Sequence, residues 1–185
     1  MSKPKSMLFM SLAQRNLVKH LESNRGRLYR MAYAWTHDAD TAEDVVQEAT
    51  IKALKSVDSL REIKALDGWL FRILHNCFYD HCRKQRDSVD IDDIVLEDSE
   101  TPEHVSGQDE MLRSVRQAIG ELPVKYREVV TLVDIESFAY AEVAEILDVP
   151  IGTVMSRLNR ARGKLREMLQ NPNAGDNAAD LQVVR

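Results

Sequence analysis

Apolar residues recur every three or four positions along two separate parts of this 185-residue chain, residues 8–86 and residues 109–170. In the first part, Leu17, Leu21 and Leu28 begin a stripe that one face of an α-helix would carry. Seven Gly and five Pro are few for this length, which leaves long uninterrupted segments and disfavours a turn-rich β fold. The pattern therefore predicts an all-α protein made of two small helical domains.

The stripes also indicate where individual helices lie. In the first part we expect a helix containing residues 17–32, a second helix around residues 45–54 with Thr41 as its cap, and a third over residues 69–86. Residues 56–67 are expected to form a short connection. In the second part we expect four helices, whose apolar stripes span residues 111–122 (ended by a proline), 126–133, 140–147 and 153–169.

Charge is distributed unevenly along the chain. Residues 87–110 contain ten Asp or Glu residues and no Lys or Arg, so leaving them out changes the net charge from −5 to +5. Because these acidic residues repel one another, we expect residues 87–108 to form a flexible linker between the two domains. Residues 171–185, which are rich in Asn, Asp and Ala, are expected to be disordered. The mildly basic remainder is compatible with nucleic-acid binding.

Residues 140–158 have the layout of a helix-turn-helix. Val143, Ala144 and Leu147 would give the first helix an apolar inner face, and the small Ala144 would allow a close crossing. The Val-Pro pair at residues 149–150 is expected to end this helix, because proline cannot continue it.

The second helix of this motif is expected to begin at Gly152 and Thr153, with Thr153 as its cap. A recognition helix needs short polar groups near its start to bond base edges, and basic groups to hold phosphates. Ser156 and Asn159 meet the first need. Five residues meet the second, namely Arg157, Arg160, Arg162, Lys164 and Arg166. Periodicity alone fits a plain basic amphipathic helix with a solvated face equally well.

Three stretches of the sequence resemble the extracytoplasmic-function (ECF) sigma factors of the sigma-70 family. Pro150–Val154, Ser156–Leu158 and Arg160–Arg162 together resemble the helix that reads the promoter in that family. Ala42–Ala49 resembles the family's polymerase-binding helix, and Trp69–Asp80 resembles its minus-ten segment. The motifs follow one another in the family's order. This order is stronger evidence for the resemblance than a helix-turn-helix alone would be.

The resemblance implies a sigma region 2-like domain over residues 8–86 and a sigma region 4-like domain over residues 109–170. The first would bind core RNA polymerase and the minus-ten element, and the second would bind the minus-thirty-five element. The implied polymerase-binding residues are Asp44, Gln47 and Glu48. On their residue types alone, these three would also suit a solvated polar face.

The helix over residues 69–86 shows which side chains are available for DNA. Its core side is expected to consist of Trp69, Leu70, Ile73, Leu74, Cys77 and Phe78. An Asn amide can pair with a base edge and an aromatic ring can stack on it, although the orientation of Tyr79 stays open. The candidate DNA-binding residues of the whole chain are Arg72, Asn76, Tyr79, Arg83, Lys84, Arg86, Gly152, Thr153, Ser156, Arg157, Asn159 and Arg160.

Three positions depart from the family pattern. Met155 stands where Lys or Arg is usual, which puts one phosphate or base contact in doubt. Ala139 replaces a common Ser before the first helix of the motif, which would remove a cap worth about 1 kcal/mol. Thr50 replaces a large apolar residue, so the packing behind the polymerase-binding helix is expected to differ.

The resemblance names three partners: core RNA polymerase, promoter DNA and an anti-sigma factor. We expect no cofactor, no small-molecule substrate and no enzymatic activity, because no catalytic triad or Gly-rich phosphate loop is visible. Two rival hypotheses stay open. A stand-alone helix-turn-helix regulator would bind duplex DNA tightly without polymerase, and a protein-binding adaptor would tolerate charge reversal at Arg157 and Arg160.

Two further features bear on metals and location. His75, Cys77, His81 and Cys82 lack the Cys-x-x-Cys pairing of structural zinc sites, so we expect no metal. The apolar run at residues 7–13 is too short to span a bilayer, so we expect a cytoplasmic protein without membrane insertion.

Overall fold

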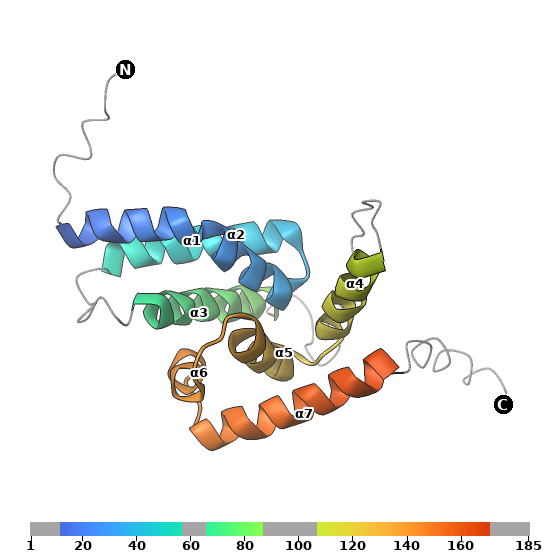
Figure 1. The fold of residues 1–185 in the computed structure, drawn as a ribbon. Helices are drawn as coiled ribbons and strands as arrows, with labels where there is room; N and C mark the ends of the chain where they lie inside the picture. Colours follow the sequence, from blue (N-terminus) through green and yellow to red (C-terminus); the bar gives the residue numbers. More distant parts are fainter. Residues whose placement is uncertain (1–11, 57–65, 87–106, 171–185) are drawn as a thin grey trace. The chain divides into compact units, whose positions relative to one another are not determined.

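The computed structural model describes residues 12–56, 66–86 and 107–170 (Figure 1). These residues form helices and short turns, without a strand among them, which confirms the all-α prediction. The chain divides into two compact units, one made chiefly of residues up to Leu96 and one chiefly of residues from Glu97. Most of the predicted linker and the whole predicted tail lie outside the described residues.

The N-terminal unit contains α1 (Leu12–Thr36), α2 (Ala39–Ser56) and α3 (Leu66–Arg86), each packed against the other two (Figure 1). Trp35 is completely buried at its centre, with its ring centroid 5.9 Å from that of His75 and 5.7 Å from that of Phe78. The predicted stripes of α1 and α2 are buried except for Leu54, which is partly exposed. The buried members are Leu17, Leu21, Leu28, Met31, Ala32, Val45, Val46, Ala49 and Ala53.

The cap predicted for α2 was wrong by one turn. The Asp38 carboxylate, not Thr41, caps the helix, since it accepts a hydrogen bond from the Thr41 backbone N–H at 2.6 Å. Asp38 directly precedes the first helical residue, which is where a side-chain oxygen reaches the unpaired N–H groups of the first turn. Hydrogen bonding from Thr41 lowers the pKa of Asp38.

The core side of α3 also differs from the prediction. Trp69 and Ile73 are only half-buried, whereas Phe71 and His75 are buried together with the rest of the expected stripe. Because α3 packs on both α1 and α2, its buried arc is wider than the single stripe that periodicity suggests. Part of the ring of Phe71 is covered by Arg27 of α1, whose guanidinium carbon lies 4.9 Å from the ring centroid.

The C-terminal unit begins with α4 (Gly107–Gly120) and α5 (Val124–Val130), which continues into a π-helical turn (Thr131–Ile135). We predicted that Met111, Val115, Ile119 and Leu122 would line one helix ended by a proline. Ile119 and Leu122 are buried as expected, but the end of the helix and the exposure of Met111 differ from the prediction. The helix stops at Gly120, and Met111 is 73% exposed.

A buried arginine of the next helix binds the end of α4. The Arg127 guanidinium donates hydrogen bonds to the carbonyl oxygens of Gly120 and Leu122, the second at 2.9 Å. These carbonyls lie at and just beyond the end of α4, where backbone groups lack helical partners. Burial lowers the pKa of Arg127 to about 10, with the buried Glu128 opposing the shift, so the guanidinium stays charged at neutral pH.

The helix-turn-helix consists of α6 (Tyr140–Leu147), with the bounds expected, and α7 (Ile151–Gln170). The α6 helix is ended by Asp148, whose φ of 53° lies in the left-handed region. The backbone N–H of the next residue, Val149, donates a hydrogen bond to the Ala144 carbonyl at 3.0 Å. This is a Schellman-type end, which precedes the proline that we expected to end the helix.

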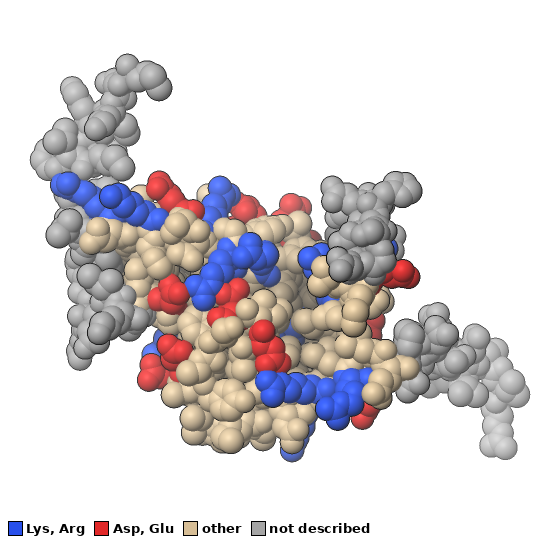
Figure 2. All heavy atoms as spheres, in the orientation of Figure 1, with Lys and Arg blue, Asp and Glu red and all other residues tan. Residues whose placement is uncertain are grey.

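The predicted cap of α7 was likewise wrong. The helix begins at Ile151, and the Pro150 carbonyl accepts the N–H groups of Thr153 and Val154 at 2.8 and 3.3 Å. Thr153 therefore lies inside the first turn and cannot cap it. Lys and Arg side chains form a band over the middle and C-terminal half of α7 (Figure 2).

The inner face of α6 is made of Val143, Ile146 and Leu147, which are buried, while the expected Ala144 is partly exposed. On α7 the buried residues are Val154, Leu158 and Ala161. The α7 helix also packs on α4 and α5, which leaves its opposite face exposed.

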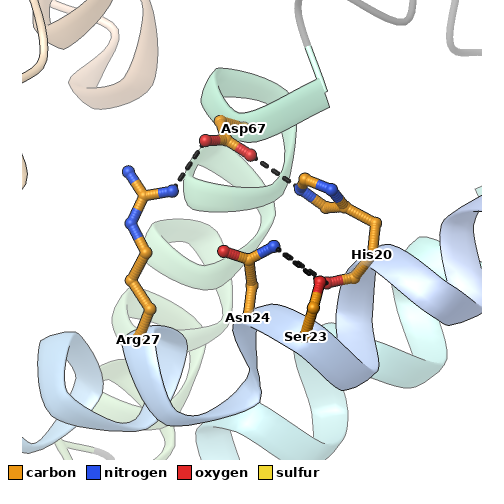
Figure 3. Close-up of polar contacts among 5 residues, drawn as sticks. All are labelled: His20, Ser23, Asn24, Arg27 and Asp67. Atoms are coloured by element: carbon orange, nitrogen blue, oxygen red, sulfur yellow. Dashed lines mark hydrogen bonds and ion pairs between the residues drawn. The ribbon is translucent and has the colours of Figure 1, made fainter.

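A cluster of polar side chains joins α1 to the start of α3 (Figure 3). Asp67 of α3 lies between two residues of α1, with one carboxylate oxygen 2.6 Å from Arg27 and the other 2.7 Å from His20. Asn24 holds this turn of α1 by donating to the His20 carbonyl at 2.9 Å. Partial burial would raise the pKa of Asp67, but Arg27 and His20 outweigh it and lower the pKa.

Lys52 makes the corresponding link between α2 and α3. Its ammonium group lies 2.9 Å from the Asp80 carboxylate of α3 and 3.0 Å from the Glu48 carboxylate one turn earlier in α2. Asp80 is the main cause of the raised pKa of Lys52, and Lys52 is the main cause of the lowered pKa of Asp80.

Membrane insertion was not expected, and among the described helices none is long and apolar enough to cross a bilayer.

Completing the cap of α6 should stabilise the C-terminal unit. The Ala139 N–H donates to the Glu142 carboxylate at 2.8 Å, which is one half of a capping box. An Ala139→Ser side chain would accept the Glu142 N–H and supply the other half, adding about 1 kcal/mol. Thermal unfolding followed by circular dichroism, with hydrogen exchange of the α6 amides, measures the gain. Ala141→Ser, exposed within the first turn, is the control and should add nothing.

Acid should destabilise the N-terminal unit. The pKa values of Asp38, Asp67 and Asp80 are lowered, so the folded state favours their ionised forms. The stability they contribute is present above their ordinary pKa and is lost as the pH falls below about 4. Trp35 and Trp69, the two tryptophans of the chain, both lie in this unit, so tryptophan fluorescence reports its thermal midpoint.

Asp67→Asn should remove part of this pH dependence, because the neutral amide keeps its size but loses the ion pairs with Arg27 and His20. Glu22→Gln, exposed on α1, is the matched control and should retain the wild-type profile. A tryptophan-detected midpoint that stays constant down to about pH 3 would contradict the prediction.

Candidate functional site

One exposed face of α3 carries most of the candidate DNA-binding residues of the N-terminal unit. Arg72, Asn76, Tyr79 and Arg83 are spaced by four, three and four residues, and all four are exposed. Because residues at these intervals lie on one side of a helix, the structure brings the four together, opposite the buried Leu70, Leu74 and Cys77. Lys84 is also exposed, and the side chain of Arg86 lies outside the described part.

The orientation of Tyr79, which the sequence left open, is set by aromatic contacts. Its ring centroid lies 4.7 Å from that of His75 and 5.5 Å from that of Phe78, yet the residue is 39% exposed. His75 in turn contacts the buried Trp35. A chain of ring contacts thus runs from the core to the surface and holds Tyr79 beside Asn76.

This surface combines three chemical groups. An aromatic ring offers a face on which a base can stack, an amide pairs with a base edge, and guanidinium groups bind phosphates or stack on bases. Such a surface suits unpaired bases of a nucleic acid better than it suits a small-molecule substrate.

The polar face of α2 lies beside the α3 surface and is tied to it. Asp44 and Gln47 are exposed, and Glu48 is partly exposed while held by Lys52. Sequence reasoning did not single out Lys52. The i, i+4 pair with Glu48 was visible in the sequence, but the partner Asp80 is 28 residues away. Thr50, where a large apolar residue was expected, donates its hydroxyl hydrogen to the Val46 carbonyl at 2.8 Å.

The outer face of α7 holds the candidates of the C-terminal unit. Gly152, Ser156, Asn159 and Arg160 are all exposed on this side. Two other candidates, Thr153 and Arg157, are partly buried at the flank of the helix, so the structure does not bring them onto the same face. The Ser156 hydroxyl donates to the Thr153 carbonyl at 3.0 Å, which holds its oxygen near the helix surface.

Two of the basic residues of α7 also fix the helix in place. Arg162 makes a bidentate ion pair with Asp134 of the π-helical turn, with its Nε 3.1 Å from the carboxylate. The Asp134 carboxylate is also the main cause of the raised pKa of Arg162. A hydrogen bond with Arg160 lowers the pKa of Tyr126 in α5. Arg162, which was expected to hold phosphate, also positions α7 through its contact with Asp134.

The His and Cys residues of α3 lie on the buried side of the helix or are partly exposed. His75 and Cys77 are buried, and burial raises the pKa of the Cys77 thiol. Within the described segments, no three His, Cys, Asp or Glu side chains gather in a way that could hold a metal ion.

Two protein-family models match the chain, in the same order as its two helical units. Sigma-70 region 2 matches residues 20–88, and Sigma-70, region 4 matches residues 112–165. The first match contains α2 and α3, and the second contains α6 and most of α7.

Individual relatives agree with the family models. The chain is 31% identical to the ECF RNA polymerase sigma factor SigW of Bacillus subtilis, over 80% of this chain and 85% of the relative. It is 36% identical to the ECF RNA polymerase sigma factor EcfG of Rhodopseudomonas palustris, over 83% of this chain and 84% of the relative.

A solved structure shows the same fold. The sigma factor RpoE from Bartonella quintana, crystallised with the anti-sigma factor NepR, is 31% identical, with a TM-score of 0.73. The match covers 84% of this chain and 98% of that one. The chain therefore belongs to the ECF sigma factors of the sigma-70 family, alternative sigma factors that direct transcription initiation.

Proposed function

We propose that this sigma factor binds core RNA polymerase through α2, holds the melted minus-ten element on α3 and reads the minus-thirty-five element with α7. The observation that carries the proposal is the exposed row Arg72, Asn76, Tyr79 and Arg83, which lies on the helix next to the polar face of α2. One small unit thus presents a protein-binding surface and a base-binding surface.

The polar face of α2 suits a basic partner. Asp44 and Gln47 are exposed, and Glu48 is held in place by Lys52, so the carboxylates are presented from a rigid helix. Carboxylates on a fixed helix can pair with Arg or Lys of a partner at little further loss of side-chain freedom. We assign polymerase binding to these three residues.

The exposed row on α3 suits single-stranded DNA. Asn76 can bond the edge of a base that has left its partner, and Tyr79 is held by His75 and Phe78 with its ring partly exposed. Arg72, Arg83 and Lys84 would hold the phosphates on either side, and Arg86, at the end of α3, extends the basic series.

The outer face of α7 suits duplex DNA. Its first turns place Gly152, Ser156, Asn159 and Arg160 on one exposed side, where a recognition helix contacts base edges. Thr153 and Arg157 at the flank would contact the backbone, since phosphates lie beside a helix in the major groove.

The solved relative with its anti-sigma factor supports a third partner. We assign this chain an anti-sigma factor that covers the surfaces used for polymerase and DNA. We further assign residues 87–108 the role of tether between the two domains, and the cytoplasm as the location, since the DNA and polymerase partners lie there. No enzymatic activity is part of the proposal.

Run-off transcription tests the proposal. Purified core polymerase is given a library of promoter fragments with and without this chain, and we expect selective transcripts that require it. Asn76→Ala should reduce open-complex formation, and Arg160→Glu should reduce promoter binding about tenfold or more, because it places a negative charge against DNA. Lys19→Glu, exposed on α1, is the control for charge reversal and should keep wild-type activity.

The rival hypotheses give different results. No added transcription and no co-elution with core enzyme would overturn the proposal. Tight sequence-specific binding of free protein to duplex DNA would then indicate a stand-alone regulator, and wild-type activity of Arg160→Glu would indicate a protein-binding adaptor.

Gly152→Ala should separate folding from DNA binding. A Cβ at Gly152 would meet nothing within 4 Å, so alanine should stabilise the helix by about 0.5 kcal/mol. If DNA approaches α7 at its first turn, the added methyl group should nevertheless weaken minus-thirty-five binding severalfold. Gly163→Ala, later in α7 and also with nothing within 4 Å, should stabilise without this loss. Unchanged DNA binding by both variants would contradict the docking.

A further inference from the structure

Two large apolar side chains are exposed at the start of α7. Ile151 is 48% exposed and Met155 is 54% exposed, and they lie four residues apart, hence one above the other on the helix surface. The residues that pack α7 into its unit are Val154, Leu158 and Ala161. Ile151 and Met155 thus contribute little to the core of the unit.

The apolar pair adjoins the polar residues of the outer face. Met155 is followed directly by the exposed Ser156, and Asn159 is one turn further along on the side of Met155. Gly152, between the two apolar residues, leaves open space around its backbone. Anything that contacts Ser156 and Asn159 therefore also meets the thioether of Met155.

The chemistry of DNA limits what a thioether can recognise there. Phosphates and the polar edges of bases offer no attraction to an apolar side chain, whereas the C5-methyl group of thymine is the apolar group of the major groove. Methionine is long, flexible and polarisable, so its side chain can pack against a methyl group without a fixed geometry. A basic side chain at this position would instead bind a phosphate.

We propose that Met155, supported by Ile151, reads the methyl group of a thymine in the minus-thirty-five element and so determines part of the promoter specificity of this sigma factor. The inference rests on the proposed function of α7. Burying one methyl group against the thioether should change affinity about fourfold, which is the equivalent of about 0.8 kcal/mol.

Replacing thymine by deoxyuridine tests this inference, because the substitution removes the methyl group and nothing else. Holoenzyme assembled from core polymerase and the full chain is titrated with a promoter selected by run-off transcription. Each thymine of either strand of the minus-thirty-five element is replaced in turn. We expect one replacement to weaken binding by about threefold to tenfold.

Variants assign the effect to its residue. In Met155→Ala the sensitive replacement should no longer matter, and affinity for the natural promoter should fall to the level that wild type shows with deoxyuridine. Ser156→Ala is the matched control and should keep the ratio between thymine and deoxyuridine, whatever its own affinity.

Several results would overturn the inference. The first is that wild-type holoenzyme binds every deoxyuridine-substituted promoter as tightly as the natural one. The second is that the sensitive replacement still weakens binding by Met155→Ala. The third is that the selected minus-thirty-five element contains no A·T pair. Loss of co-elution with core polymerase in Met155→Ala would show that the apolar pair contacts protein instead. Holoenzyme that binds no promoter at all would overturn the proposed function itself, which distinguishes that failure from the failure of methyl recognition.

Discussion

The three-way contact of Lys52 with Glu48 and Asp80 joins the two candidate surfaces of the N-terminal unit. Its ammonium group bonds a residue of the polar face of α2 and a residue that directly follows Tyr79 on α3. Ordering one long side chain serves two carboxylates, so less conformational entropy is lost per ion pair than in two isolated pairs. The positions of the exposed residues of α2 and α3 relative to one another depend on this link and on the packing of Trp35 against α3.

In the C-terminal unit, the charged side chain of Arg127 links helices as Lys52 does in the N-terminal unit. Arg127 is buried, and its guanidinium donates hydrogen bonds to the carbonyl groups of Gly120 and Leu122, at and just beyond the end of α4. A buried cation without such partners would cost several kcal/mol. The contact fixes the turn between α4 and α5, and α5 supports α7 through Tyr126 while the adjoining π-helical turn supports it through Asp134. These contacts on the inner side of α7 therefore fix the position of its outer face.

Both units present their candidate binding residues on helices rather than on loops. A side chain whose position is already fixed loses little freedom on binding, and this favours affinity and selectivity. Tyr79 illustrates the point, since three aromatic contacts connect it to the core while its ring stays partly exposed. The ion pairs between α1 and α3 at Asp67 hold the other end of the same helix.

The sequence by itself determined the features that depend on near neighbours. Helical periodicity located the helices and the bounds of α6, and it separated the exposed Arg72, Asn76 and Arg83 from the buried side of α3. The caps were local too, but Asp38 and Asp148 were missed because Thr41, three residues from Asp38, and Pro150, two residues from Asp148, were equally plausible from the sequence.

Only the tertiary structure decided which residues meet across helices. Lys52 and Asp80 are 28 residues apart, and Arg27 and Asp67 are 40 apart. Burial of Phe71 in place of Trp69 likewise follows from the contact of α3 with two helices at once. The period of a helix fixes which side chains share a face, but the angle at which a second and third helix pack on it fixes how much of that face is buried.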